Sequence, residues 1–252
     1  RDGRIDPEEV RELLRPDTVL AAVCAVDSEL GTVQPVEEIA ALLADRPNCR
    51  LHVAATQAVG RIPVSFSGID TMSFAPHKFG GLCGSGVLLK RSRMPLEPQM
   101  HGGASTTLYR SGTPALGLAA ATAFSLELAC AGREERCAIV RRHSVRLRKV
   151  LSAYPAVRIN SPEGAVPHIL NLSVKNVKGT VFQRALSERG VCVSVKSACS
   201  ADGLPSRAVF AVSRDRRNAL SSWRISLSHL TTDAEIDEFL AIFDECYHEL
   251  VK

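Results

Sequence analysis

The stretch at residues 73–81 (SFAPHKFGG) constrains the fold of this chain more than any other. A short apolar run ends there in the pair His77-Lys78, and Gly80 and Gly81 follow the pair closely. Because Pro76 and the glycines disfavour a regular helix through the pair, we expect a rigid turn after a strand. The amine of Lys78 is then held at one place.

A lysine amine at such a turn is suited to covalent chemistry. In a dry pocket it can form an imine with a carbonyl cofactor such as pyridoxal 5'-phosphate (PLP). The alternative is an ordinary solvated lysine at the end of a strand. The local residues leave both possibilities open.

The segments around this turn have the pattern of an α/β fold. Residues 18–26 form an uninterrupted apolar run, which predicts a strand buried on both faces. A helical pattern at 35–44 separates it from a second strand at 50–54, and residues 71–75 and 85–90 flank the lysine turn. Strand, helix and strand in succession predict a mainly parallel sheet. Ligands of such sheets bind outside the carboxyl ends of the strands, where Lys78 falls.

The second half of the chain has a different pattern. Two long helices are expected at 115–131 and 133–151, and shorter alternating segments follow. The expected strands are 169–174, 191–195 and 223–227, and the expected helices are 181–189 and 233–251. We therefore expect two domains, residues 1–118 and residues 119–252, with the long helices as the hinge between them.

Composition argues against several classes of protein. The 252 residues carry a net charge of +4 and only 5% aromatic residues, which disfavours a nucleic-acid platform. No apolar run is long enough for a membrane span, and the chain does not open with a signal peptide. Its eight cysteines form no C-x-x-C pair, so a zinc site or a thioredoxin-like motif has no support. Widely spaced thiols indicate a reducing compartment, and we expect a cytoplasmic protein without a metal.

Several short motifs occur in one order along the whole chain. They are residues 29–31 (ELG), 52–60 (HVAATQAVG), 72–78 (MSFAPHK), 99–103 (QMHGG), 110–113 (RSGT), 197–199 (SAC) and 223–237 (WRISLSHLTTDAEID). In these motifs the chain resembles the cysteine desulfurases of the class V aminotransferase superfamily, and specifically their iron–sulfur-cluster branch. The resemblance implies a PLP-dependent transferase of fold type I.

The resemblance also implies roles for residues that would bind the cofactor. Lys78 matches the lysine that holds PLP through an imine, and His77 matches a phosphate contact. Gln57 matches the residue that bonds the phenolic oxygen of PLP, and Ser28 stands where the family has a cofactor-facing asparagine. Thr113 matches a residue that reaches the phosphate of the neighbouring subunit's cofactor, which implies a homodimer.

Two further residues match the family's substrate chemistry. Arg224 matches the arginine that binds the substrate carboxylate, a role that suits a planar bidentate donor. Cys199 matches the nucleophile that takes sulfur from L-cysteine, becomes a persulfide and passes the sulfur to an acceptor protein. The alternatives are a strand-end surface arginine and a buried structural thiol.

The chain departs from the family pattern at several places. Ala54 stands where the family has an aspartate that pairs with the pyridine nitrogen of PLP, and Ala75 replaces a phosphate-binding serine. The family's N-terminal third has no counterpart, so we expect either a longer chain or a further chain that supplies this part. Besides a cysteine desulfurase, two alternatives therefore stay open. One is a degenerate relative that acts as a binding or assembly partner, and the other is a selenocysteine lyase or another class V enzyme.

Overall fold

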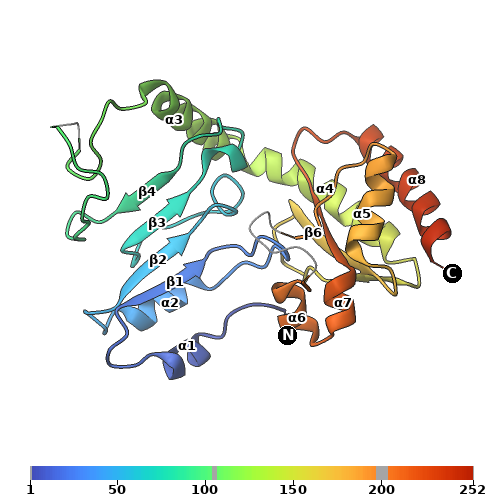
Figure 1. Cartoon of the computed structure of the whole chain (residues 1–252), viewed down its shortest axis with the longest axis horizontal. Helices are drawn as coiled ribbons and strands as arrows, with labels where there is room; N and C mark the ends of the chain where they lie inside the picture. Colours follow the sequence, from blue (N-terminus) through green and yellow to red (C-terminus); the bar gives the residue numbers. More distant parts are fainter. Residues whose placement is uncertain (1, 104–106, 197–203, 252) are drawn as a thin grey trace. The chain divides into compact units, whose positions relative to one another are not determined.

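The chain forms two compact units (Figure 1). The computed structural model describes residues 2–103, 107–196 and 204–251. Unit 1 consists of Arg1–Ile5, Val26–Gln34 and Arg133–Lys252, and unit 2 of Asp6–Ala25 and Pro35–Gly132.

Unit 2 contains the four-stranded sheet that carries the lysine turn. Its elements are α1 (Pro7–Leu13), β1 (Leu20–Cys24), α2 (Val36–Leu43), β2 (Arg50–Ala54), β3 (Thr71–Phe74), the 3-10 helix η1 (Pro76–Lys78), β4 (Val87–Lys90) and α3 (Leu116–Ala131). The strands lie in the order β1-β2-β3-β4, the first three are parallel and β4 is antiparallel to β3. The expected α/β fold with a mainly parallel sheet is thereby confirmed.

Side chains alternate along the central strands of this sheet. In β2, Leu51 and Val53 are buried, whereas His52 and Ala54 are half-buried. The same alternation in β3 gives the sheet one buried face and one half-buried face, as the two-residue period of a strand requires.

The prediction that the first strand is buried on both faces is wrong. In β1 the residues alternate between exposed and half-buried, and Leu20 is 56% exposed. Among the described residues β1 pairs only with β2, and at this edge of the sheet fewer side chains cover the strand than at the central strands β2 and β3. An apolar run indicates that burying the segment is favourable, but it does not indicate which other elements will cover it.

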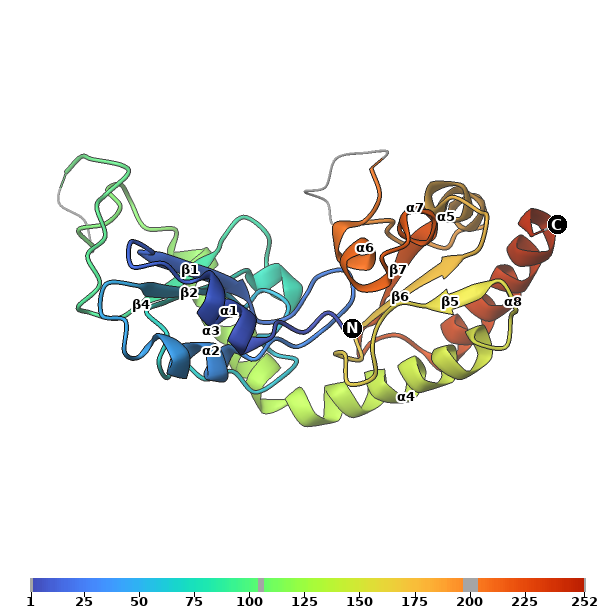
Figure 2. The same ribbon diagram turned by 90° about the horizontal axis from the view of Figure 1, so that it is seen from below.

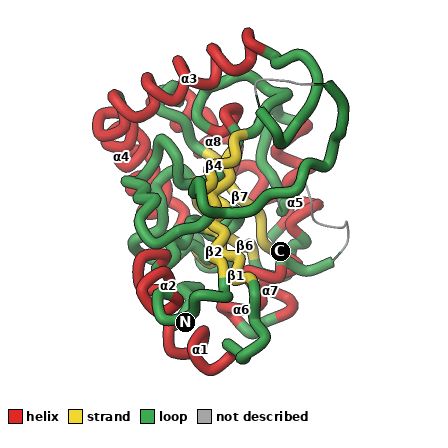
Figure 3. Tube along the Cα trace, turned by 90° about the vertical axis from the view of Figure 1, so that its left-hand side faces the viewer, coloured by secondary structure: helices red, strands yellow, loops and turns green. Residues whose placement is uncertain are grey.

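The segment between β4 and α3 carries no regular helix or strand in its described part (Figure 3). It comprises residues 91–115, of which 104–106 lie outside the described residues. A bridge between Met100 and Arg110, together with hydrogen bonds from Ser111 to the carbonyl of Met100, joins two parts of this segment.

Unit 1 is built around a three-stranded antiparallel sheet. Its elements are α4 (Arg133–Leu151), β5 (Val157–Ile159), β6 (Ile169–Val174), α5 (Gly179–Glu188), α6 (Arg207–Ser213), α7 (Arg216–Ser221), β7 (Ser222–Ser226) and α8 (Asp233–Leu250). The order is β5-β6-β7, and Figure 2 shows α4 running along this sheet. The core joins α4, α5 and α8 to the sheet, with the rings of Phe182 and Trp223 stacked at 5.3 Å.

Several expected elements of the second half differ from the structure. The segment 191–195 is not a strand, since only Ser194 forms a bridge, to Arg224. Conversely, β5, α6 and α7 were not expected, because each is too short for a clear period. The expected boundary between residues 118 and 119 lies within α3, whereas the units divide at Gly132. The assignment of 1–118 and 119–252 as domains stays a prediction.

Within the described part of the chain, no helix combines the length and the apolar character that a membrane span needs.

Candidate active site

The turn that follows β3 holds Lys78 as the sequence predicts. Pro76 is buried and opens η1, and the Lys78 N–H donates to the carbonyl of Ala75 at 3.2 Å. The N–H groups of Phe79 and Gly81 both donate to the carbonyl of Pro76, at 3.0 and 2.9 Å. The backbone on both sides of Lys78 is therefore constrained, while its side chain is exposed.

Close packing adds a second constraint on this turn. A Cβ atom at Gly81 would lie 2.7 Å from both the Cβ of Pro76 and the Oγ of Ser125 in α3. Since Cβ atoms essentially never approach other atoms so closely, only glycine fits here. Gly81 therefore allows α3 to pack closely against the turn that carries Lys78.

The turn that follows β2 brings Gln57 to the lysine turn. Arg61 donates a hydrogen bond from Nη1 to Oε1 of Gln57, and another from Nη2 to the carbonyl of Lys78 at 3.2 Å. Both turns follow the carboxyl ends of parallel neighbouring strands, which explains why they meet. Sequence reasoning named Gln57 and Lys78 but missed Arg61. The available signal was its spacing of four residues from Gln57.

The half-buried face of the sheet ends beside Ala54. In register with Ala54 lie Cys24 of β1 and Ser73 of β3. The ring of His52 contacts the hydroxyls of Thr71 at 2.9 Å and Ser73 at 3.1 Å. The strand neighbours of Ala54 therefore supply a thiol and a hydroxyl, and neither carries a carboxylate.

Two other expected cofactor residues of unit 2 lie on exposed segments. His77 is exposed within η1, next to Lys78. Thr113 is exposed in the segment before α3, and no hydrogen bond joins it to the lysine turn among the described residues. Their roles as phosphate contacts stay predictions.

Unit 1 brings Arg224 and Ser28 together. Arg224 of β7 donates from Nη1 to the carbonyl of Ser28 at 2.7 Å and from Nε to Oγ of Ser226 at 3.2 Å. Burial lowers the pKa of the Arg224 guanidinium, and the carboxylates of Glu29 and Asp27 oppose that shift. A half-buried guanidinium that is positioned by these two bonds is suited to bind a carboxylate with its remaining donors.

A compact loop positions the Ser28 carbonyl that Arg224 contacts. Oδ1 of Asp27 accepts from the N–H groups of Glu29 at 2.9 Å and Leu30 at 2.6 Å. Oε2 of Glu29 accepts from the Ser206 hydroxyl at 2.5 Å, and this carboxylate is buried. The first acid of the chain's Asp-Ser-Glu-Leu-Gly sequence therefore closes the loop, and the second anchors it to α6.

The expected nucleophile, Cys199, belongs to the segment 197–203, which is outside the described residues. Its role as the sulfur acceptor therefore stays a prediction.

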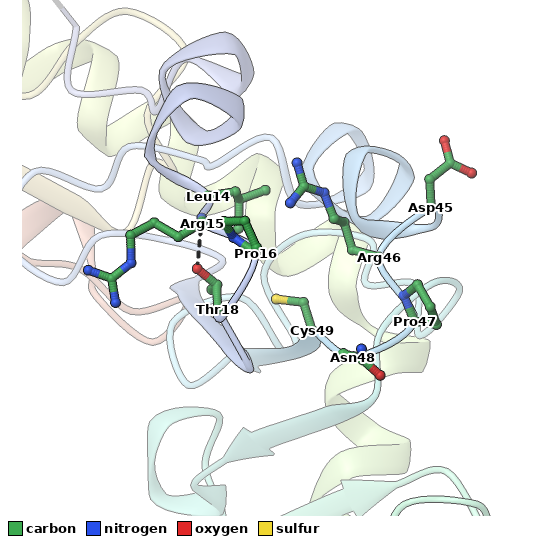
Figure 4. Close-up of a pocket in the computed structure, with 9 residues that line it drawn as sticks. All are labelled: Leu14, Arg15, Pro16, Thr18, Asp45, Arg46, Pro47, Asn48 and Cys49. Atoms are coloured by element: carbon green, nitrogen blue, oxygen red, sulfur yellow. Dashed lines mark hydrogen bonds between the residues drawn. The ribbon is translucent and has the colours of Figure 1, made fainter.

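A pocket of about 100 Å³ lies elsewhere in unit 2 (Figure 4). It is lined by Leu14, Arg15, Pro16, Thr18, Asp45, Arg46, Pro47, Asn48 and Cys49. These residues precede β1 and β2, so the pocket lies at the amino-terminal edge of the parallel strands. Lys78 follows the opposite edge, and the pocket is not part of its site.

Comparison with known proteins identifies the family. The profile described as "Aminotransferase class-V" matches residues 1–239. The chain belongs to the class-V aminotransferases. It is 34% identical to a NifS/IcsS protein homolog of Lactobacillus delbrueckii subsp. bulgaricus, over 100% of this chain and 67% of that protein. It is 35% identical to a mitochondrial cysteine desulfurase of Eremothecium gossypii, over 97% of this chain and 50% of that protein.

Solved structures agree with this class-V assignment. A NifS-like protein that is 30% identical superimposes with a TM-score of 0.90, over 99% of this chain and 66% of that one. A NifS-like protein from Rickettsia africae is 26% identical and has a TM-score of 0.88. The expected fold type I architecture is thereby confirmed. The chain spans from half to two thirds of the length of the curated relatives described above.

The class-V family is PLP-dependent, and the residues of this chain fit one end of that cofactor. The amine of Lys78 stands on a rigid turn, and the side-chain amide of Gln57 is held next to that turn by Arg61. At Ala54, by contrast, no acid is present to pair with a pyridine nitrogen. These residues are therefore suited to an aldehyde and a phenolic oxygen, and Ala54 itself offers no charge to a ring nitrogen.

Proposed function

We propose that the protein containing this chain is a PLP-dependent cysteine desulfurase. It would remove sulfur from L-cysteine, release alanine and carry the sulfur as an enzyme persulfide. The observation that carries the proposal is the rigid Lys78 turn at the carboxyl edge of the sheet, joined by Arg61 to Gln57. Relatives that bear the name cysteine desulfurase add support, at 30–35% identity.

Each candidate residue of this chain has its own role in the proposed reaction. Lys78 would bind the aldehyde carbon of PLP through Nζ and, once displaced, would move protons at the substrate carbon. Gln57 would donate from its amide nitrogen to the phenolic oxygen, and His77 and Thr113 would contact phosphate. When bound, PLP supplies the electron sink that stabilises negative charge on the substrate carbon.

Substrate binding and sulfur transfer would involve unit 1. Arg224 would hold the carboxylate of L-cysteine, and Ser28 would line the site beside it. The thiolate of Cys199 would take the sulfur atom as a persulfide and deliver it to an acceptor protein. Iron–sulfur cluster or thio-cofactor assembly would consume this sulfur.

The proposal extends to assembly and location. We propose a homodimer, from the match of Thr113, and a cytoplasmic location, from the wide spacing of the cysteines in the sequence. The part of the fold that has no counterpart here would come from a longer chain or from a further chain.

The decisive test of this function is sulfur transfer by Cys199. The intact protein with PLP and a thiol reductant should convert L-cysteine to equal amounts of alanine and sulfide. Cys199→Ser should lower sulfide release by about a thousandfold or more, because a hydroxyl is a far weaker nucleophile at neutral pH. Persulfide labelling followed by mass spectrometry should find the extra sulfur at Cys199.

The matched control is Cys192→Ser, since Cys192 is an exposed cysteine of unit 1 outside the proposed site. It should leave the rate unchanged. Sulfide release that survives Cys199→Ser would contradict the assignment of the nucleophile. Preferred turnover of selenocysteine in the same assay would instead favour a selenocysteine lyase.

A second candidate function is favoured by Ala54. Without the family's acid at this place, the chain could be a degenerate relative that serves as a binding or assembly partner. That function predicts no sulfide from L-cysteine and a stable complex with another chain. Sulfide release that depends on Cys199 would exclude it.

Arg224→Lys should mainly weaken substrate binding. Lysine keeps the charge but loses the planar fork, so we expect KM for L-cysteine to rise by about tenfold or more. The change in kcat should be smaller, because the carboxylate does not react. Steady-state kinetics of alanine formation measure both constants. Arg184→Lys is the control, on an exposed surface pair with Glu188, and an equal KM in both variants would contradict the role.

A further inference from the structure

We propose that Arg61 is a positioning residue that fixes the Gln57 amide relative to Lys78. The inference rests on the proposed function, in which Gln57 and Lys78 bind one cofactor. Arg61 itself would touch neither cofactor nor substrate.

The local backbone places Arg61 beside Gln57. The N–H of Val59 donates to the carbonyl of Ala55 and that of Ile62 to Ala58, both at 3.0 Å. These bonds close two overlapping turns, which form no regular helix because Gly60 has a φ of +74°, and they bring residue 61 back toward residue 57. The guanidinium of Arg61 can therefore reach back to the Gln57 side chain.

The contact between Arg61 and Gln57 determines which end of the Gln57 amide faces Arg61 and which end is left for the cofactor. A guanidinium carries only donors, so the atom of Gln57 that it meets must be the oxygen, Oε1. The amide nitrogen then lies on the side away from Arg61, where it can donate to another group. A phenolic oxygen of a cofactor requires such a donor, so the contact selects the useful orientation of the amide.

The other end of the guanidinium sets the position of the turn that carries Lys78. Nη2 donates to the Lys78 carbonyl at 3.2 Å, and the neighbouring Gly60 packs closely on Phe79. A Cβ at Gly60 would lie 3.1 Å from the Cβ of Phe79, and the residue has a φ of +74°. The two turns therefore contact each other twice, through the hydrogen bond from Arg61 to Lys78 and through the packing of Gly60 on Phe79. Because the guanidinium is planar, both of its bonds constrain one geometry.

Loss of Arg61 should therefore act through Gln57. Without its partner the amide can rotate, and the free carbonyl end can face the phenolic oxygen as often as the amino end. We expect Arg61→Met to lower the affinity for PLP by about tenfold to a hundredfold, the usual range for one charge-assisted hydrogen bond. It should also change the pH at which the visible band of lysine-bound PLP shifts.

Arg91→Met provides a matched control. Arg91 is a half-buried arginine of unit 2 that donates to the carbonyls of Ile69 at 2.7 Å and Phe66 at 3.0 Å. Arg91→Met therefore loses two hydrogen bonds, as Arg61→Met does, but neither of the bonds lost from Arg91 involves Gln57 or Lys78. A merely structural effect should appear equally in both variants.

The experiment combines a double-mutant cycle with hydrogen exchange. PLP affinity of the intact protein is measured by absorbance titration for wild type, Arg61→Met, Gln57→Leu, the double variant and Arg91→Met. If Arg61 acts through Gln57, the double variant should bind PLP no more weakly than Gln57→Leu alone. In the cofactor-free protein, amide exchange at residues 55–62 and 76–81 should accelerate in Arg61→Met but not in Arg91→Met.

The outcomes separate this inference from the proposed function. Additive losses in the cycle, or unchanged PLP affinity in Arg61→Met, would overturn the positioning role. Unchanged exchange in both turns would overturn the contact itself. A wild-type protein that shows no lysine-bound PLP overturns the proposed function instead, and the exchange data then decide the Arg61 contact on their own.

Discussion

Replacing Lys78 by alanine is expected to abolish the visible absorption band of lysine-bound PLP and to lower alanine formation from L-cysteine by about a thousandfold or more. The expectation follows from the position of Lys78. Its backbone N–H donates to the carbonyl of Ala75 and its own carbonyl accepts from Arg61, so the turn holds the base of the lysine side chain at one place. The absorption spectrum of the protein reconstituted with PLP and a product assay measure the two effects.

The matched control for this variant is Lys175→Ala. Lys175 is an exposed lysine of unit 1 and keeps its backbone hydrogen bond to Ala156 when the side chain is removed. It should retain the band and the activity. A visible band that persists in Lys78→Ala would contradict the assignment of the cofactor lysine and, with it, the proposed function.

Replacing Ala54 by aspartate is expected to increase activity. A carboxylate at this place would lie between Cys24 and Ser73 in the sheet register, where no acid is present now. It would favour the protonated pyridine nitrogen and strengthen the electron sink. Electrostatic groups that act at developing charge are worth about a hundredfold or more in kcat. We therefore expect alanine formation from L-cysteine to rise by about tenfold to a hundredfold at saturating PLP.

Ala54→Asn separates charge from size. Asparagine has nearly the same shape as aspartate but cannot stabilise a protonated nitrogen by its charge, so its rate should stay close to that of Ala54. Equal rates in the aspartate and asparagine variants would show that the ring nitrogen does not face this position. Thermal unfolding of both variants should be recorded, since position 54 is half-buried and a carboxylate there loses part of its hydration.

The elements that the sequence predicted well are those with a strong local signal. The strand at 169–174 has the predicted bounds, because it is apolar at alternate positions and buried throughout. The lysine turn also formed as expected, since Pro76 and Gly81 restrict the backbone locally. The segment 191–195 has a similar apolar content but forms only a bridge at Ser194. Its partner at this bridge is Arg224 of β7, which is distant in the sequence.

Sequence motifs named candidate residues whose roles stay predictions, and the contacts between these residues came only from the structure. Gln57, Lys78, Ser28 and Arg224 were each named from motifs, but their hydrogen-bond partners could not be. Arg61 carries no motif signal of its own, and its importance depends on two turns meeting at one sheet edge.

The sequence by itself determined the alternation of strands and helices, the rigid turn around Lys78 and the family to which the chain belongs. These properties follow from local backbone restrictions and from the order of short motifs along the chain. Only the tertiary structure decided that β1 is an exposed edge, that Cys24 and Ser73 flank Ala54, and that Arg61 joins the turns of Gln57 and Lys78. Such relations depend on which strands become neighbours, and pairing between distant segments leaves no local trace in the order of residues.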